Sequence, residues 1–195
     1  VDCGGANCIP CPPSVQDCLG AIPICQNIYT ETNAYSGVGI YPNEINSANS
    51  CLGSGEKNDV WYIFTVQQSG NLCFSITPNT SSDDYDWAVY DLTNNICSDI
   101  FTDPSLEVSC NYDLVSGVTG PNGLGGTQNE LCIPLIQGST MVLNVSQFTT
   151  STSGYTIDFS ATTAQIFDNT QPTITSIDIN CDKDSLLLTF SEQII

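Results

Sequence analysis

The 195-residue sequence contains no histidine, no arginine and only two lysines, Lys57 and Lys183, against 21 Asp and Glu. The formal net charge is therefore −19. Proteins that bind nucleic acid neutralise phosphates with clustered Lys and Arg, and attraction to anionic lipid surfaces needs the same groups. This charge balance excludes nucleic acid and an anionic membrane surface as partners.

The lack of histidine excludes a further set of functions. A Ser-His-Asp or Cys-His nucleophile, a histidine general base and a histidine metal ligand all need the imidazole ring. A pair of carboxylates can hydrolyse glycosides, but among 21 acids the sequence singles out no pair. We therefore expect a protein that is not an enzyme. No apolar run approaches the roughly 18 residues of a membrane-spanning helix, so no membrane insertion is expected.

What is present indicates a folded chain. Hydrophobic residues make up 41% of the sequence and charged residues 12%, which is not the composition of a disordered protein. The length suits one sizeable domain plus a fragment, because domains commonly contain about 100–200 residues. Val1 opens the sequence without a charged and then apolar leader, so we expect a processed chain or a segment of one.

Eleven cysteines are scattered along the whole length, many of them inside apparent strands. This distribution favours disulfides formed in an oxidising compartment, so we expect an extracellular protein, secreted or on the cell surface. We expect Cys97 to pair with Cys110 across a short surface loop, and Cys73 with Cys132 between neighbouring strands. The count is odd and Cys181 stands alone, so its partner is expected beyond Ile195 or on another chain.

Residues 1–26 hold five cysteines and four prolines without any periodicity. This pattern predicts an N-terminal cap shaped by disulfides. The string Cys8-Ile9-Pro10-Cys11 also allows a zinc site or a redox dithiol, but the paired Cys-x-x-Cys units or the strand leading into a helix that accompany such sites are missing. Structural disulfides are the favoured interpretation.

From residue 58 onward the pattern has period two, which is typical of β-strands. Residues 60–66 and 72–76 flank the turn signal Ser69-Gly70-Asn71 and predict a hairpin. Each of the further runs is short, rich in β-branched or aromatic residues, and bounded by turn residues. These predicted strands cover residues 85–92, 106–110, 141–148 and 155–161.

Many short strands without an amphipathic helix predict an all-β fold, namely an antiparallel, jelly-roll-like and disulfide-rich β-sandwich over residues 27–168. Two polar loops, residues 30–55 and 111–130, are expected on the surface at one end of the sandwich. Two more apolar strands follow a break near Asp168. Since two strands alone do not form a stable domain, residues 169–195 are predicted to be a linker and the start of an Ig-like domain.

The acidic cluster Asp83, Asp84 and Asp86 is the strongest candidate for a binding site. Carboxylates this close repel one another, and the chain has almost no cation to offset them. Calcium takes six to eight oxygen ligands, and Asn58 and Asp59 at the start of another strand are placed to complete the set. The spacing does not fit an EF-hand, and a solvated acidic loop screened by bulk ions remains the alternative.

Aromatic residues form a second candidate surface. Alternation along the strands places one set of side chains in the core, whereas the other set either packs as well or forms a flat row that stacks sugars. These strand aromatics are Trp61, Tyr62, Phe64, Trp87 and Tyr90. Tyrosines in the expected loops are better candidates for exposed contacts, and they are Tyr29, Tyr35, Tyr41 and Tyr112.

Four strings follow one another along the chain: Asn58 to Val66, Asp83 to Leu92, Val108 to Tyr112 and Ser153 to Phe159. In this order they resemble the N-terminal β-sandwich module of large Bacteroidota surface proteins, which are described as gliding-motility-associated or type IX secretion cargo. The resemblance spans roughly residues 16–168. It implies secretion across the outer membrane and display or release at the cell surface.

The C-terminal segment also resembles parts of such proteins. Residues 172–192 are similar to the start of a bacterial Ig-like repeat, and Asp184-Ser185-Leu186 resembles the O-glycosylation motif of Bacteroidota, with Ser185 as the modified residue. The sandwich region is more distantly similar to bacterial pre-peptidase C-terminal domains. That resemblance implies a non-catalytic sandwich of a kind that often binds calcium.

Together these observations predict a non-catalytic extracellular module of a large secreted cell-surface protein, stabilised by calcium and serving adhesion or structural display. The expected partners are an extracellular surface, a glycan or protein ligand, or neighbouring copies of the module itself. The alternative is a carbohydrate-binding or calcium-dependent accessory module of a secreted enzyme.

Overall fold

The computed structural model describes residues 12–168, 173–179 and 185–191, and these residues form an all-β fold. Its helices are short 3-10 turns, η1 (Cys18–Gly20), η2 (Cys97–Asp99) and η3 (Pro104–Leu106). No helix in these ranges has the length and apolar character needed to cross a bilayer. The strands are β1 (Ile22–Pro23), β2 (Ile28–Thr30), β3 (Val60–Thr65), β4 (Gly70–Leu72), β5 (Ser75–Pro78), β6 (Tyr85–Asp91), β7 (Glu107–Asn111), β8 (Ile133–Leu135), β9 (Thr140–Gln147), β10 (Tyr155–Asp158), β11 (Ile174–Ile179) and β12 (Leu186–Phe190).

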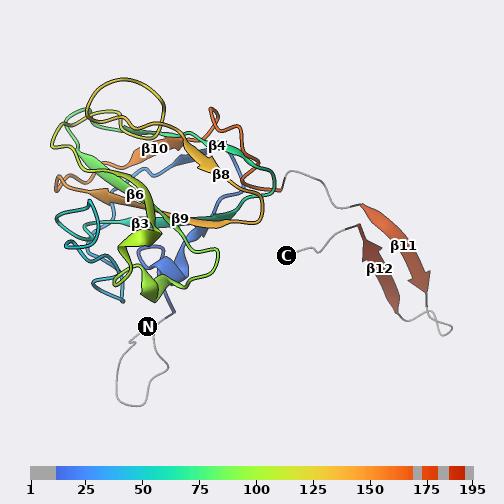
Figure 1. Cartoon of the computed structure of the whole chain (residues 1–195). Helices are drawn as coiled ribbons and strands as arrows, with labels where there is room; N and C mark the ends of the chain where they lie inside the picture. Colours follow the sequence, from blue (N-terminus) through green and yellow to red (C-terminus); the bar gives the residue numbers. More distant parts are fainter. Residues whose placement is uncertain (1–11, 169–172, 180–184, 192–195) are drawn as a thin grey trace, which may run out of the picture.

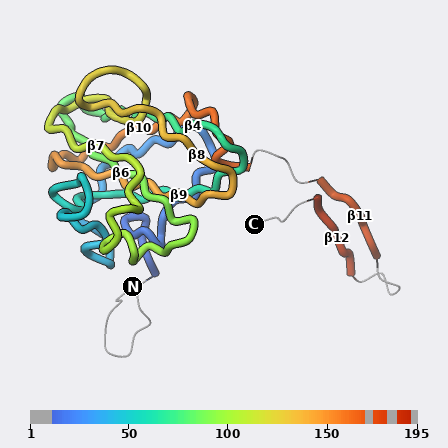
Figure 2. The backbone as a smooth tube through the Cα atoms, viewed as in Figure 1, coloured from blue at the N-terminus to red at the C-terminus, as the bar shows by residue number. Residues whose placement is uncertain are grey.

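The strands of the sandwich form two principal sheets and one small ribbon (Figure 1). The larger sheet has the order β1-β3-β9-β6-β7, the smaller has the order β2-β10-β5, and β4 pairs with β8. All of these pairs are antiparallel except β1 with β3. The predicted all-β sandwich is confirmed, and Figure 2 follows the chain through it.

Strand β3 shows how alternation builds two cores. Val60, Tyr62 and Phe64 face the smaller sheet and join a cluster that includes Ile76 of β5 and Ile157 of β10. Trp61, between them in sequence, faces the opposite side and packs in a second cluster. Both faces of the larger sheet are covered, so its central strands are buried at nearly every position rather than at every second one.

The second cluster is covered by loops instead of a sheet. Ile45 and Leu52, from the loop between β2 and β3, are buried against Trp61 and Tyr90. The expectation that this loop decorates one end of the sandwich is therefore wrong, because its apolar side chains pack onto the outer face of the larger sheet. Covering this face removes Trp61 from solvent and fixes the loop above it.

The segment that was expected to form a cap also belongs to the sandwich. Residues 12–26 provide β1, whose Ile22 lies beside Tyr62 in the larger sheet, and they bury Cys18 and Ile24. The Cys8-Ile9-Pro10-Cys11 string lies outside the described residues. A two-residue strand gives no periodic signal, which explains why the sequence pattern missed this element.

The predicted hairpin over residues 60–76 is wrong in its pairing. Strand β3 pairs with β1 and β9, whereas β4 pairs with β8 and β5 with β10. Residues 66–75 carry the chain from one sheet to the other. Period-two alternation identifies a strand and its buried face, but it does not identify the neighbouring strand.

Three disulfides crosslink the described part of the sandwich, joining Cys18 to Cys97, Cys51 to Cys110 and Cys73 to Cys132. The predicted Cys73–Cys132 bond is present. The predicted Cys97–Cys110 bond is wrong, because the loops that cover the outer face bring η1 to η2 and residue 51 to β7. These partners are 79 and 59 residues apart in sequence, so proximity along the chain gave no indication of them.

The hairpin β11–β12 stands apart in sequence from the sandwich, and both of its predicted strands are confirmed. Apolar side chains on both faces are exposed, including Ile177 on one face and Leu187 on the other. Ser185, the candidate glycosylation site, is exposed immediately before β12, and its modification stays a prediction. Cys181 lies outside the described residues.

Candidate functional site

The five residues predicted to bind calcium do not form one site. Successive side chains of a strand point to opposite faces, and this separates Asp83 from Asp84 and Asp86. Asp83 faces the sandwich interior, where it accepts a hydrogen bond from the hydroxyl of Ser151 at 2.5 Å and raises the pKa of Tyr85, after the larger effect of burial.

Asp84 and Asp86 lie together on the other face with Asp113 and Lys57. Both aspartates are about 6% exposed. Burial, and then Asp84, raise the pKa of Asp86 to about 7, while Lys57 works in the opposite direction. Burial and Asp113 raise the pKa of Asp84. The Lys57 ammonium also lies 4.1 Å from the centroid of the Phe148 ring.

Asn58 and Asp59 belong to a different neighbourhood. The Asn58 side chain accepts a hydrogen bond from the backbone of Gly37 at 3.0 Å. This bond fixes the loop between β2 and β3, residues 31–59, which we call the covering loop. Asp59 is fully buried, and its Oδ2 accepts a hydrogen bond from the amide of Asn144 at 2.8 Å. Asp59 precedes β3 and Asp86 lies on β6, with β9 between them. Trp61 and Ala88, two residues further along, share the outer cluster, so both acids face the same side of the larger sheet.

A tight cluster of ligand atoms occurs at one place in the described residues, and it is not a calcium site. Cys51, Glu107 and Cys110 bring one ligand atom each within 4.8 Å of one another. The two sulfurs are joined in a disulfide, so they are not thiolate ligands. Glu107 instead fixes the covering loop, because it accepts hydrogen bonds from the Ser50 hydroxyl and from the backbone of Cys51.

The structure brings Asp59 near three acids that the sequence analysis did not single out: Asp17, Glu44 and Glu56. We call these four residues the loop carboxylates. Asp17 is fully buried, and its Oδ1 accepts hydrogen bonds from the backbone of Ile40 at 2.7 Å and of Tyr41 at 2.8 Å. In sequence these acids look like solvated loop residues, so only the folded loop reveals their arrangement.

Glu44 and Glu56 hold the same loop in a similar way. Glu56 accepts hydrogen bonds from the backbone of Asn43 at 3.0 Å and of Ile45 at 3.1 Å, one on each carboxylate oxygen. Glu44 accepts one from the backbone of Cys18 at 2.9 Å. Asn43 has a positive φ of 67°, which turns the backbone amides on either side of Glu44 toward Glu56. Backbone N–H groups thus take the place of the missing Lys and Arg as partners of these acids.

The loop carboxylates interact electrostatically. Burial, followed by the charges of Asp59 and Glu44, raises the pKa of Glu56 to about 8. Burial also raises the pKa of Glu44 to about 7 and that of Asp59 to about 7. In Asp17 burial acts in the same direction, but the hydrogen bonds from Tyr41, Ser14 and Ile40 outweigh it and lower the pKa.

These shifts predict that the free energy of unfolding falls as the pH rises from about 5 to about 8. Glu44, Glu56 and Asp59 have higher pKa values in the fold than the roughly 4 of an unfolded chain, so the folded state binds more protons across this range. Urea midpoints measured across this range test the prediction, and Glu56→Gln should flatten the upper part of the curve. A stability that rises with pH over the same range would contradict it.

The strand aromatics are core residues. Trp61, Tyr62, Phe64, Trp87 and Tyr90 are all buried, so no row of strand aromatics is exposed to stack sugars. Of the loop tyrosines, Tyr41 and Tyr112 are each 41% exposed. The expectation that Tyr29 lies in a loop is wrong, because it belongs to β2, and Tyr29 and Tyr35 pack partly buried against the core. The sequence also does not show that the outer face of the sheet is covered.

Tyr112 borders an open cleft of about 530 Å³ beside the Cys51–Cys110 disulfide. Its ring packs against Gly53, where a Cβ atom would lie 3.3 Å from the phenol. Asn111 and Glu130 also line the cleft, and the amide of Asn111 donates a hydrogen bond to Glu130 at 3.0 Å. The cleft thus combines one aromatic ring with amide and carboxylate groups.

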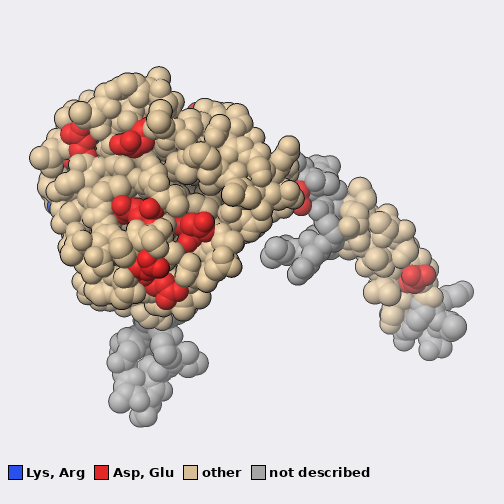
Figure 3. Space-filling model, viewed as in Figure 1, with Lys and Arg blue, Asp and Glu red and all other residues tan. Residues whose placement is uncertain are grey.

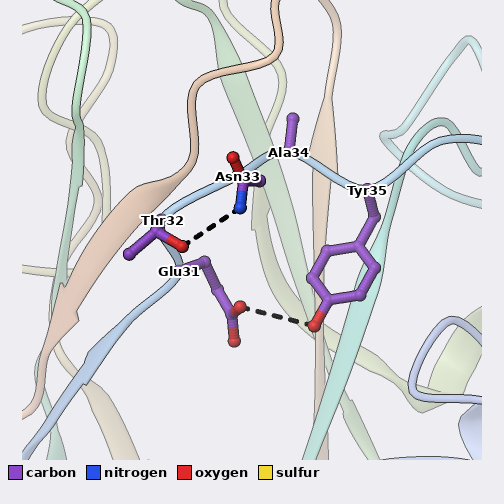
Figure 4. Close-up of a pocket in the computed structure, with 5 residues that line it drawn as sticks. All are labelled: Glu31, Thr32, Asn33, Ala34 and Tyr35. Atoms are coloured by element: carbon purple, nitrogen blue, oxygen red, sulfur yellow. Dashed lines mark hydrogen bonds between the residues drawn. The ribbon is translucent and has the colours of Figure 1, made fainter.

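A smaller cavity of about 250 Å³ follows β2 and is lined by the single segment 31–35 (Figure 4). Figure 4 shows the Tyr35 hydroxyl directed at the Glu31 carboxylate, to which it donates a hydrogen bond of 3.3 Å. Burial and then Glu31 raise the pKa of Tyr35. The Tyr35 phenol therefore stays protonated and donates to the Glu31 carboxylate.

The surface carries acidic patches that are separate from one another. Figure 3 shows several of them across one face of the sandwich, with blue confined to the edge of the view. Lys57 is the only basic residue among the described ones. Protons, solvent ions or bound cations, rather than basic side chains, must therefore neutralise most of these acids.

Comparisons with known proteins give no relative from which a function can be transferred. No family model, curated protein or solved structure matches this chain. Functional inference therefore depends on the geometry described above.

Proposed function

We propose that this chain is a non-catalytic extracellular module of a secreted or surface-displayed protein and that it serves adhesion or structural display. The observation that carries this proposal is that disulfides crosslink the segments that cover the outer face of the larger sheet. Two of the three disulfides in the described residues do this, and they join Cys18 to Cys97 and Cys51 to Cys110. Disulfides persist in oxidising compartments, and loops held this rigidly lose little entropy when a ligand binds.

The resemblance to Bacteroidota surface modules agrees with this proposal and extends it. On this resemblance we propose that the chain is type IX secretion cargo and that the hairpin β11–β12 is the opening of an Ig-like repeat. The apolar side chains on both faces of this hairpin are consistent with strands that pack in a larger sandwich. The expected ligands are glycans or proteins of an extracellular surface, or neighbouring copies of the module.

The leading proposal is tested by binding of the purified, oxidised chain to immobilised extracellular proteins, to a glycan array and to itself by sedimentation. Specific binding to one of these surfaces, without release of product from glycan or peptide substrates, supports an adhesive or structural module. Turnover of a substrate by the chain alone would contradict the proposal, because it requires a catalytic site that a non-catalytic module does not have.

A carbohydrate-binding accessory module is the second candidate, and the Tyr112 cleft favours it. Sugar rings stack on exposed aromatic faces, and their hydroxyl groups hydrogen-bond to amides and carboxylates. The cleft provides Tyr112 together with Asn111, Asp113 and Glu130. Its floor includes the Cys51–Cys110 disulfide, which limits movement of the lining residues.

Tyr112→Ala should weaken glycan binding by about 5- to 150-fold, because loss of a stacking ring commonly removes about 1–3 kcal/mol. Isothermal titration with a glycan that binds the wild-type chain measures the change. Tyr41→Ala is the matched control, since both tyrosines are 41% exposed but Tyr41 does not line this cleft. Equal losses in the two variants would argue against the cleft as the sugar site.

A calcium ion is part of the proposed function, as a stabiliser of the fold. Asp84 and Asp86 are two predicted ligands that lie close to each other on the outer face of the larger sheet, and Asp113 lies near them. Calcium bound there would offset charges that Lys57 alone does not balance. The melting temperature with calcium and with a chelator tests this part of the proposal.

A further inference from the structure

An apolar groove of about 380 Å³ lies between the segments that cover the outer face of the larger sheet. Its walls come from η1, from the covering loop and from residues 96–101 around η2. The apolar side chains that line it are Leu19, Tyr41, Ile96 and Phe101. This groove is separate from the Tyr112 cleft, because the two share no lining residue.

The apolar walls of the groove are open to solvent. Leu19 and Ile96 are each 65% exposed, Tyr41 is 41% exposed and Phe101 is 39% exposed. Single apolar residues scattered over a surface are normal, whereas several of them gathered in one hollow mark an interaction site. The groove thus presents apolar area that a bound partner removes from water.

The Cys18–Cys97 disulfide holds the groove in shape. It joins η1 to η2, and Cys97 itself lines the groove. The covering loop is connected to η1 through Glu44, which also lines the groove and accepts a hydrogen bond from the backbone of Cys18 at 2.9 Å. All three walls are therefore linked, so little order has to be created when a partner binds.

Two acids border the groove, and no basic residue of the described ranges does. Glu44 belongs to its lining. At the η2 wall, the Asp99 carboxylate accepts a hydrogen bond from the backbone of Ile96 at 3.0 Å, which places it beside a lining residue. Lys57, the only base in the described ranges, lies over the Phe148 ring instead. The groove therefore complements an apolar group that carries a positive charge next to it.

The same features decide which partner fits. Small-molecule pockets bury about 70–90% of their ligand, and walls that are themselves 39–65% exposed do not enclose a ligand to that extent. Side chains that project from a partner protein need less enclosure. An anionic lipid surface is repelled by acids, and a second copy of the chain brings its own net charge of −19. A protein partner with basic residues is favoured.

We propose that the groove between η1, the covering loop and η2 binds a protein partner through apolar side chains that have Lys or Arg next to them. The apolar side chains contact Leu19, Ile96 and Phe101, while the basic groups pair with Glu44 and Asp99 at the border. This inference rests on the proposed adhesive function, because it names the chemistry of the protein ligand that the function requires.

Labelled peptides test the inference on the full oxidised chain. The pH is set to about 8, because burial raises the pKa of Glu44 to about 7 and the carboxylate is then mostly ionised. A peptide in which leucine alternates with lysine should bind, and fluorescence anisotropy gives its dissociation constant. Replacing its leucines by serine, or its lysines by glutamate, should weaken binding by at least about tenfold.

The Leu19→Ser/Ile96→Ser double variant should weaken binding of the leucine–lysine peptide by about 10- to 100-fold, because both side chains lose the apolar area that the peptide buries. Leu124→Ser/Leu131→Ser is the matched control. Leu124 is 64% exposed and Leu131 is 81% exposed, and neither lines the groove. Since all four side chains are exposed, both double variants should fold.

Asp99→Asn tests the charge at the border separately. It keeps an acceptor for the backbone of Ile96 and should weaken binding by about 1.5- to 5-fold, which corresponds to one exposed ion pair. Asp158→Asn is the matched control, because Asp158 also accepts a hydrogen bond from a backbone amide, that of Ser160 at 2.8 Å, but lies on β10 of the smaller sheet. Each variant removes one negative charge, so a loss confined to Asp99→Asn locates the bound cation at the groove.

Four outcomes would overturn the inference. Equal binding of the leucine–glutamate peptide contradicts the need for a cation, and equal binding by the Leu19→Ser/Ile96→Ser variant and the wild-type chain places the peptide elsewhere. Self-association that this variant abolishes makes the groove an interface between copies. Failure of the leucine–lysine peptide to bind a chain that still binds an extracellular protein removes the groove as the docking site and leaves the adhesive function intact.

The opposite failure is distinguishable. If the peptide binds the groove but the chain binds no extracellular protein, glycan or copy of itself, the groove is supported and the adhesive function is contradicted.

Discussion

Replacing Cys51 and Cys110 together by serine should lower the melting temperature of the oxidised chain by about 5–15 °C. The bond joins residues 59 positions apart, and loss of a native disulfide of this kind typically removes about 2–5 kcal/mol. For a domain of this size, 1 kcal/mol corresponds to about 2–4 °C. Thermal unfolding followed by circular dichroism measures the change.

The location of this disulfide gives a further consequence. Cys51 precedes Leu52, which is buried against Trp61 in the outer cluster. The bond therefore holds the Leu52 side chain against the outer face of the larger sheet. Without the bond, the loop should open before the sandwich unfolds, and hydrogen exchange of residues near Leu52 should increase more than that of β9. Cys25→Ser is the control, because Cys25 is exposed and forms no disulfide with another cysteine of the described ranges. An unchanged melting temperature in the double variant would contradict the prediction.

The sequence predicted the strands well because each central strand carries its own signal. The strand predicted over residues 85–92 corresponds to β6, and the one predicted over residues 141–148 corresponds to β9. Their pairing with β3 was not predictable, since alternation fixes the face of a side chain and not the neighbouring strand. The short strands β1 and β8 carry too few residues for any period to be visible.

The predicted calcium ligands are divided by the same strand geometry that made the strand predictions succeed. Asp83, Asp84 and Asp86 are neighbours in sequence, but a strand turns Asp83 away from the other two. Glu44 and Glu56 are 12 residues apart in an aperiodic loop, yet they share a neighbour in Asp59. Proximity in an irregular loop depends on tertiary contacts, so the sequence alone gives no indication of it.

The protein has almost no basic residues, and its buried acids are paired with backbone amides instead. Asp17, Glu44, Glu56 and Glu107 all accept hydrogen bonds from loop backbone amides. Irregular loops leave many N–H groups without secondary-structure partners, and burying them unpaired is unfavourable. In this chain the buried carboxylates have almost no basic residues as partners, and the loop amides have no secondary-structure acceptors. Each group therefore satisfies the other, because the carboxylates accept hydrogen bonds from the amides.

Asp17→Ala tests this relationship at its most buried member and should be among the most destabilising substitutions of a loop residue. Asp17 is fully buried and accepts hydrogen bonds from the backbone and hydroxyl of Ser14 and from the backbone of Ile40 and Tyr41. An unsatisfied buried donor typically removes about 1–3 kcal/mol, and several donors lose their acceptor together. The free energy of unfolding from urea titration should fall by about 3–5 kcal/mol.

Asp103→Ala is the matched control for that variant, because Asp103 also accepts hydrogen bonds from a backbone amide and a hydroxyl, both of Ser105, but does so in contact with solvent. Water replaces the lost acceptor there, so the change in unfolding free energy should be much smaller. If the two variants lose equal stability, the buried amides at Ile40 and Tyr41 have found other acceptors, and the covering loop does not depend on Asp17. If the loss is confined to Asp17→Ala, burial of the carboxylate is what makes these hydrogen bonds necessary for the fold.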